Sequence, residues 1–70
     1  MTQVTPHTPA ERRDAIKQEL MVERFLTVGE IAARLAASEA TIRRDLIALE
    51  REGAVERTHG GATVPNIRTA

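Results

Sequence analysis

The sequence predicts a single, mainly α-helical domain that ends in a small β-hairpin. Apolar residues recur at helical spacing in three successive segments, and a Gly-Gly pair separates two short extended stretches near the end of the chain. The chain has 70 residues and no cysteine, so we expect one hydrophobic core that forms without disulfides. Each element of this domain follows from a local signal.

A first helix is predicted over residues 9–24. Thr8 and Glu11 have the spacing of a capping box, and Pro9 stands at the first helical position, where its missing N–H costs nothing. The face expected to point inward holds Arg12, Ile16 and Leu20. The other charged side chains are expected to form a solvated surface: Arg13, Asp14, Lys17 and Glu19.

A second helix is predicted over residues 28–35. Thr27 and Glu30 repeat the capping-box spacing, which places the start of the helix at Val28. Apolar residues then follow at helical spacing and predict one buried face: Val28, Ile31, Ala32 and Leu35. The segment between the two helices offers only Phe25 and Leu26, which are too few for a full strand.

A third helix is predicted over residues 39–52. Ser38 is a favourable N-cap, and Gly53 can end the helix in a left-handed turn. The join to the second helix is short, with Ala36-Ala37 at its centre. Such a connection forces the two helices to cross steeply, so the outer face of the third helix projects beyond the domain.

The hairpin is predicted from two extended stretches, residues 55–58 and 62–64, joined by His59-Gly60-Gly61. Glycine takes positive φ at little steric cost, which suits a tight turn. Three helices followed by such a hairpin, or wing, are typical of a winged helix-turn-helix. In that fold the third helix can enter the major groove of DNA.

The two faces of the third helix differ in character. Ile42, Leu46 and Leu49 fall in one narrow sector, which predicts the buried face. The outward face and its flanks hold Ala40, Thr41, Arg43, Arg44, Ile47 and Arg51. Guanidinium groups there can reach guanine edges or phosphates. Because ten Lys and Arg balance ten Asp and Glu, DNA binding is inferred from this placement and not from net charge.

One set of spaced residues matches a known pattern: Arg12, Ile16, Leu20, Ser38, the run Thr-Ile-Arg-Arg-Asp-Leu at 41–46, Leu49-Glu50, Gly53 and residues 57–62. This set resembles the helix-turn-helix of the DeoR family of bacterial transcriptional regulators, over residues 11–64. The resemblance implies sequence-specific binding of double-stranded DNA, most often by a repressor of carbohydrate-metabolism genes. One departure is the pair Ala36-Ala37, where such proteins often have Gly.

The resemblance makes residues 38–44 the DNA-reading segment and residues 59–61 the tip of the wing. With the outward face of the third helix, the expected DNA-binding residues are Ser38, Ala40, Thr41, Arg43, Arg44, Ile47, Arg51, Arg57, His59, Gly60 and Gly61. Asp45 is expected to support the fold by orienting Arg12 or another arginine. Arg12 itself has two open alternatives, pairing with Asp45 or contacting the DNA backbone.

An enzyme is not expected, because the chain lacks a nucleophile with an adjacent His and a phosphate-binding Gly-rich loop. No cofactor or metal site is expected either, since His7 and His59 are the only histidines. The rival interpretation is a winged helix that docks on a protein. A positive stripe along the third helix and the wing would favour DNA, whereas a large apolar patch there would favour a protein partner.

The expected organisation is a flexible leader at residues 1–7, the DNA-binding domain at 8–64 and the start of a linker at 65–70, with the effector-binding domain absent. No apolar run approaches the length of a membrane span, and a cytoplasmic protein is expected. The resemblance implies a sugar-phosphate effector only for a full-length regulator. The domain alone is expected to act on DNA as a weak monomer or dimer.

Overall fold

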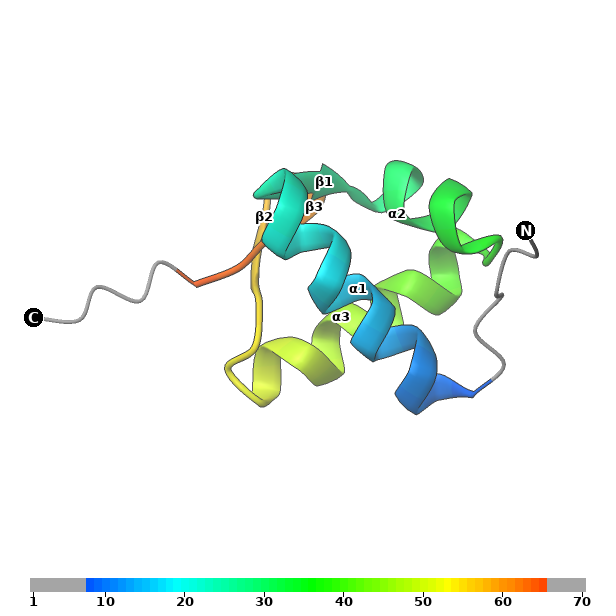
Figure 1. Ribbon diagram of the computed structural model, residues 1–70, viewed down its shortest axis with the longest axis horizontal. Helices are drawn as coiled ribbons and strands as arrows, with labels where there is room; N and C mark the ends of the chain where they lie inside the picture. Colours follow the sequence, from blue (N-terminus) through cyan, green and yellow to red (C-terminus); the bar gives the residue numbers. More distant parts are fainter. Residues whose placement is uncertain (1–7, 66–70) are drawn as a thin grey trace, which may run out of the picture.

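The computed structural model describes residues 8–65, which form three helices and one small sheet (Figure 1). The helices are α1 (Pro9–Glu23), α2 (Val28–Leu35) and α3 (Glu39–Arg51), and the strands are β1 (Phe25–Thr27), β2 (Glu56–Thr58) and β3 (Gly61–Thr63). The predicted fold class, a mainly helical winged helix-turn-helix, is confirmed. The predicted leader at 1–7 and residues 66–70 of the predicted linker lie outside the described residues.

All three helices begin where the sequence predicts, because the capping side chains form the expected bonds. Thr27 Oγ1 accepts from the backbone N–H of Glu30 at 3.0 Å, and the Glu30 carboxylate accepts from the N–H of Thr27 at 2.9 Å. The same reciprocal pair starts α1, and Ser38 Oγ accepts from the N–H of Thr41 at 3.1 Å. The ends of α1 and α3 each come one residue earlier than predicted.

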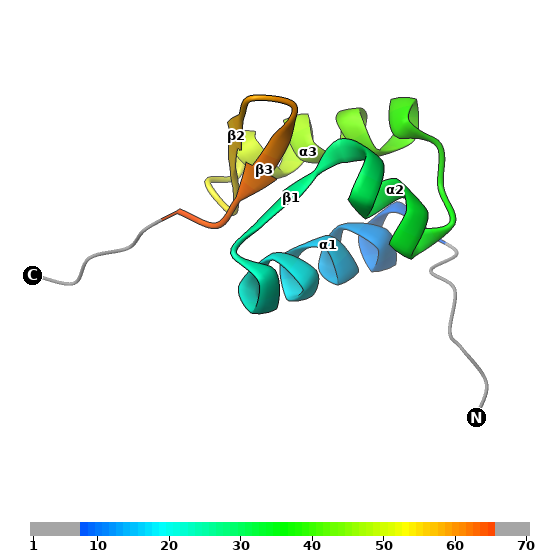
Figure 2. The ribbon, with the colours of Figure 1, turned by 90° about the horizontal axis from the view of Figure 1, so that it is seen from above.

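The prediction that residues 25 and 26 are too few for a strand is wrong. Residues 25–27 form β1, which pairs antiparallel with β3, so the sheet has the order β1-β3-β2. Leu26 lies opposite Ala62, and both are buried. A strand of three residues is stable here because it pairs with β3 and buries Leu26 in the core. Figure 2 shows β1 between the end of α1 and the start of α2, beside the hairpin.

The hairpin is tighter than predicted. The strands end at Thr58 and resume at Gly61, which face each other in the register, so the turn consists of His59 and Gly60. Gly60 has φ +69°, a conformation that glycine adopts without strain. The backbone N–H of Val28 donates to the carbonyl of Gly60 at 2.9 Å and fastens the turn to the start of α2. Residues 56–63 are called the wing below.

The hydrophobic core lies between the three helices and the sheet. The predicted inward faces of all three helices are buried except at Arg12, which is half-buried. One residue on β1, one after α3 and one on β3 complete the core. Its buried members are Ile16, Leu20, Leu26, Val28, Ile31, Ala32, Leu35, Ile42, Leu46, Leu49, Val55 and Ala62. Each fully buried Ile, Leu or Val stabilises the fold by about 1.5–3 kcal/mol relative to exposure. Aliphatic packing therefore sets the positions of α3 and the wing.

The join between α2 and α3 turns at Ala36. This residue has φ 55° and ψ 44°, the left-handed conformation in which a Cβ atom is crowded by the following carbonyl. The backbone N–H of Ala37 donates to the carbonyl of Ala32 at 3.0 Å and closes the end of α2. Glycine is the residue that this position favours, so alanine here leaves the join strained.

Ala36→Gly is expected to raise the free energy of unfolding by about 0.5–1 kcal/mol, because relief of the left-handed strain exceeds the added chain entropy of glycine. Ala37→Gly is the matched control. Ala37 has no positive φ and is half-buried, so its replacement is expected to lower stability by a similar amount. Urea unfolding of both variants measures the difference, and a loss of stability in Ala36→Gly would contradict the strain at the join.

A side chain at position 61 has no room. A Cβ atom built on Gly61 would lie 2.3 Å from the carbonyl oxygen of Leu26, on the neighbouring strand, and 2.8 Å from the ring of Phe25. Because the nearest atom belongs to backbone, the strands would have to separate. Gly61→Ala is expected to lower the free energy of unfolding by about 3 kcal/mol, at the upper end of overpacking costs.

Gly60 provides the comparison for this prediction. A Cβ there meets nothing within 4 Å, so Gly60→Ala carries only the cost of the positive φ, about 1 kcal/mol. Thermal unfolding of the two variants should therefore separate them clearly. Equal losses would show that β1 does not pack against Gly61 as described.

Candidate nucleic-acid interface

The outward face of α3 is largely as predicted. Ser38, Ala40 and the three arginines at 43, 44 and 51 are exposed, whereas Thr41 and Ile47 are half-buried. Ile47 therefore offers less surface to a partner than the helical wheel suggests. The exposed arginines follow α3 from its first turns to its last residue, and the helix begins at the cap made by Ser38.

The predicted DNA-binding residues of the wing differ in exposure. Arg57 on β2, His59 and Gly60 are exposed. Gly61 was expected at the tip, but it is a buried residue of β3 whose open side faces β1. The close approach of two strands explains why this position has no side chain, and DNA contact by Gly61 stays a prediction.

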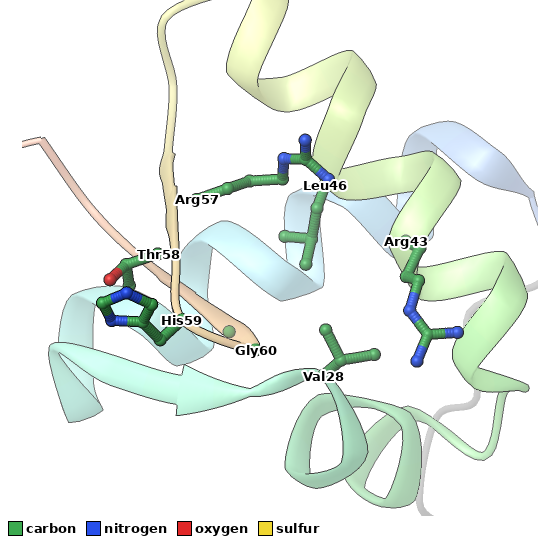
Figure 3. Close-up of a pocket in the computed structure, with 8 residues that line it drawn as sticks. Val28, Arg43, Leu46, Arg57, Thr58, His59 and Gly60 are labelled. Atoms are coloured by element: carbon green, nitrogen blue, oxygen red, sulfur yellow. The ribbon is translucent and has the colours of Figure 1, made fainter.

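An open groove of about 580 Å³ separates α3 from the wing (Figure 3). Arg43 enters it from α3, and Arg57 and His59 border it on the side of the wing. Val28 and Leu46 form an apolar floor between them. The fold thus brings predicted residues from two segments of the sequence to the walls of one groove. DNA contact by any of them stays a prediction.

Each arginine of the groove has a carboxylate partner on α3. Arg43 Nη2 donates to Glu39 Oε1 at 3.1 Å, and Arg57 Nε donates to Glu50 Oε1 at 3.1 Å. In contrast, Arg44 and Arg51 make no ion pair within residues 8–65. Neither carboxylate was predicted from the sequence as a partner of these arginines. The four-residue spacing of Glu39 and Arg43 could have indicated the first pair, but no local signal reveals the second.

Asp45 is buried at the contact of α3 with α1. Its carboxylate oxygen Oδ2 accepts from Arg12 Nε, and Oδ1 accepts from Arg12 Nη2 at 3.1 Å and from Arg13 Nε at 3.3 Å. The hydrogen bond to Asp45 raises the pKa of the Arg12 guanidinium above its ordinary value, although burial opposes the charge. Of the two alternatives for Arg12, the structure shows pairing with Asp45. Arg13 was wrongly expected to be only solvated.

A second ion cluster links α1 to α2. Arg34 Nη1 donates to Glu19 Oε1 at 2.7 Å and to Glu23 Oε2 at 3.2 Å. These hydrogen bonds raise the pKa of the Arg34 guanidinium above its ordinary value, and the bond to Glu19 contributes most. Glu19 was expected to be only a solvated side chain, so its link to α2 is a correction. The cluster lies outside the groove.

The large apolar side chains that are exposed lie elsewhere on the molecule. Met21, Val22 and Phe25 are on α1 and β1, and no large exposed apolar side chain lies on the described part of α3 or the wing. This distribution favours DNA over an apolar protein surface as the partner of α3. No group of three or more potential ligand residues within 8–65 could hold a metal ion. None of the described helices is long and apolar enough to span a bilayer.

Comparison with known proteins gives a consistent result. Residues 12–68 match the family model of DeoR-like helix-turn-helix domains. The chain is 50% identical over 52 residues to an Escherichia coli (strain K12) protein named as a putative galactitol utilization operon repressor. The aligned segment makes up 74% of this chain and 46% of that protein. It is 45% identical over 51 residues to the lactose phosphotransferase system repressor of Lactococcus lactis subsp. lactis, over 73% of this chain and 20% of the repressor.

A third relative is the transcriptional regulator GlpR of Haloferax volcanii, which is 44% identical over 54 residues, or 77% of this chain and 21% of the regulator. The chain therefore spans less than half of the length of each of these relatives. No solved structure matches the chain at a significant level.

The Asp45 cluster generates a prediction about stability. Arg12→Met leaves the carboxylate, whose side chain is 2% exposed, with Arg13 as its remaining partner. The expected loss is about 3 kcal/mol in the free energy of unfolding, because a buried charge then lacks most of its compensation. Adding Asp45→Leu is expected to restore at least half of this loss, since an apolar pair of similar size needs no compensation.

Arg13→Met is the control for this pair. Arg13 is 36% exposed and contributes one hydrogen bond, so its replacement is expected to cost about 1 kcal/mol or less. Urea unfolding of the three variants gives the comparison. Equal losses in Arg12→Met and Arg13→Met would mean that Arg12 is not the main partner of the buried carboxylate.

Proposed function

The chain belongs to the family of DeoR-like helix-turn-helix domains, and from that membership we propose that it reads specific operator sequences in double-stranded DNA. In this proposal α3 lies in the major groove and the wing follows the adjacent backbone or minor groove. The observation that carries the proposal is the shared placement of α3 and the wing, whose basic side chains line the two walls of one groove.

The proposed roles differ along α3. Arg44 is exposed and makes no ion pair among the described residues, so its guanidinium is available for a bidentate contact with guanine. Arg51 lies at the other end of the helix, where a phosphate contact is the simpler role. Ser38, Ala40 and Thr41 stand at the first turn, where small side chains allow close approach and the helix N-terminus favours phosphate oxygens. Ile47, half-buried, can touch a thymine methyl.

The biological role is proposed from the relatives. Two of them are named as repressors, one of a galactitol utilization operon and one of the lactose phosphotransferase system. We therefore propose that this domain serves a cytoplasmic repressor of carbohydrate-metabolism genes and no enzymatic reaction. Where an effector domain accompanies it, a sugar phosphate is the proposed signal. The domain alone should bind weakly, as monomer or dimer, because two linked half-sites raise affinity by effective concentration.

Arg44→Ala tests the proposal. The variant is expected to keep its thermal stability within about 0.5 kcal/mol and to lose about 1–3 kcal/mol of binding to a selected site, with relaxed preference at one base pair. The site is obtained by selection from a random duplex library, and affinity is measured by fluorescence anisotropy for this site and for a scrambled duplex.

The control is Lys17→Ala, which removes a cation from α1. It should bind both duplexes nearly like the parent domain. The parent domain should also lose affinity steeply from low to physiological salt, because its phosphate contacts release counterions. If Arg44→Ala and the parent bind both duplexes equally, α3 is not the reading helix.

A further inference from the structure

The charge of the groove between α3 and the wing depends on acidic residues as well as on its arginines. Both guanidinium groups that line it are already paired with carboxylates of α3, Glu39 with Arg43 and Glu50 with Arg57. The side chains of all four are between 44% and 57% exposed, so the pairs lie at the surface and can open. Within residues 8–65, the other two arginines of α3 have no such partner.

The first pair is formed by two residues of α3 that are four apart. While one oxygen of Glu39 accepts from Arg43, the other lies 3.3 Å from the position that a Cβ atom of Gly29 would occupy. Glycine in the first turn of α2 therefore leaves room for this carboxylate. The pair lies within α3 and next to the start of α2.

The second pair bridges two elements. Glu50 is on the last turn of α3, and Arg57 is on β2, seven residues further along the chain. The bridge crosses from α3 to the wing and uses the guanidinium that points into the groove (Figure 3). The neighbouring acidic residue on β2, Glu56, is exposed and has no ion pair in the described part of the chain.

We propose that Glu39 and Glu50 are affinity-limiting residues that compete with DNA phosphates for Arg43 and Arg57. This inference rests on the proposed function: with α3 in the major groove and the wing beyond it, the backbone strand between the two grooves passes along the groove of the protein. Carboxylate and phosphate use the same fork of guanidinium N–H donors, so a phosphate can bind fully only when the carboxylate yields.

The competition has two measurable consequences. Each exposed ion pair lowers DNA affinity by about two- to five-fold, the range that corresponds to a surface salt bridge. A carboxylate released on binding also takes up a cation, which offsets the counterion released by the phosphate. Removal of one carboxylate should therefore steepen the slope of log affinity against log salt by up to about one.

The experiment compares Glu50→Gln and Glu39→Gln with Glu56→Gln in binding to a 20-base-pair duplex of arbitrary sequence. All three variants remove one negative charge, but Glu56→Gln frees no arginine. The first two variants are expected to bind DNA two- to five-fold more tightly and to show a steeper salt slope. The third variant is expected to change both quantities less. Thermal unfolding of each variant confirms that the fold is kept.

A second arm isolates the pair. In an Arg57→Gln background, Glu50→Gln should change affinity no more than Glu56→Gln does, because the arginine through which it acts is gone. Equal effects of Glu50→Gln and Glu56→Gln in the parent background would overturn the inference in favour of general charge. Weaker binding by Glu50→Gln would overturn it in favour of a brace that holds the wing. Failure of parent and variants alike to bind any duplex would overturn the proposed function as well.

Discussion

The buried carboxylate of Asp45 fixes how α3 is rotated against α1. It is the one charged side chain among residues 8–65 that is buried, and each of its oxygens accepts from a guanidinium of α1. No buried side-chain polar atom in this part of the chain lacks a partner. Apolar contacts alone would allow a helix to turn by small amounts, whereas a forked ion pair has one geometry. Ile42, Leu46 and Leu49 are buried on one side of Asp45 around the helix axis, and Arg44 lies about 100° to the other side, where it is exposed.

The wing is positioned by a different set of contacts. The third strand of the sheet, β1, fills the space beside Gly61, and the start of α2 holds the carbonyl of Gly60 through the N–H of Val28. Thr63 Oγ1 also donates to the carbonyl of Arg24 at the end of α1. The wing is therefore joined to both α1 and α2, and the distance between its turn and α3 does not depend on the Glu50 bridge alone.

The helix starts could be predicted because their signals are local: a cap and its partner stand three residues apart, as at Thr27 and Glu30. The strand β1 could not be predicted from local signals, because its partner β3 lies more than thirty residues later in the chain. The ion pairs of Arg13 and Glu50 could not be predicted either, because each pair joins two different elements. For the glycines at 60 and 61, sequence shows a pair but not which one takes positive φ.

The chain has a formal net charge of zero, but the described cations that remain outside ion pairs are unevenly placed. Ten acidic residues balance ten basic ones, yet the carboxylates at 19, 23 and 45 are paired with arginines of the helix contacts. Glu39 and Glu50 pair with the arginines of the groove. Two of the three described cations outside ion pairs, Arg44 and Arg51, are on α3. Local pairing, and not net charge, decides where this domain can attract phosphate.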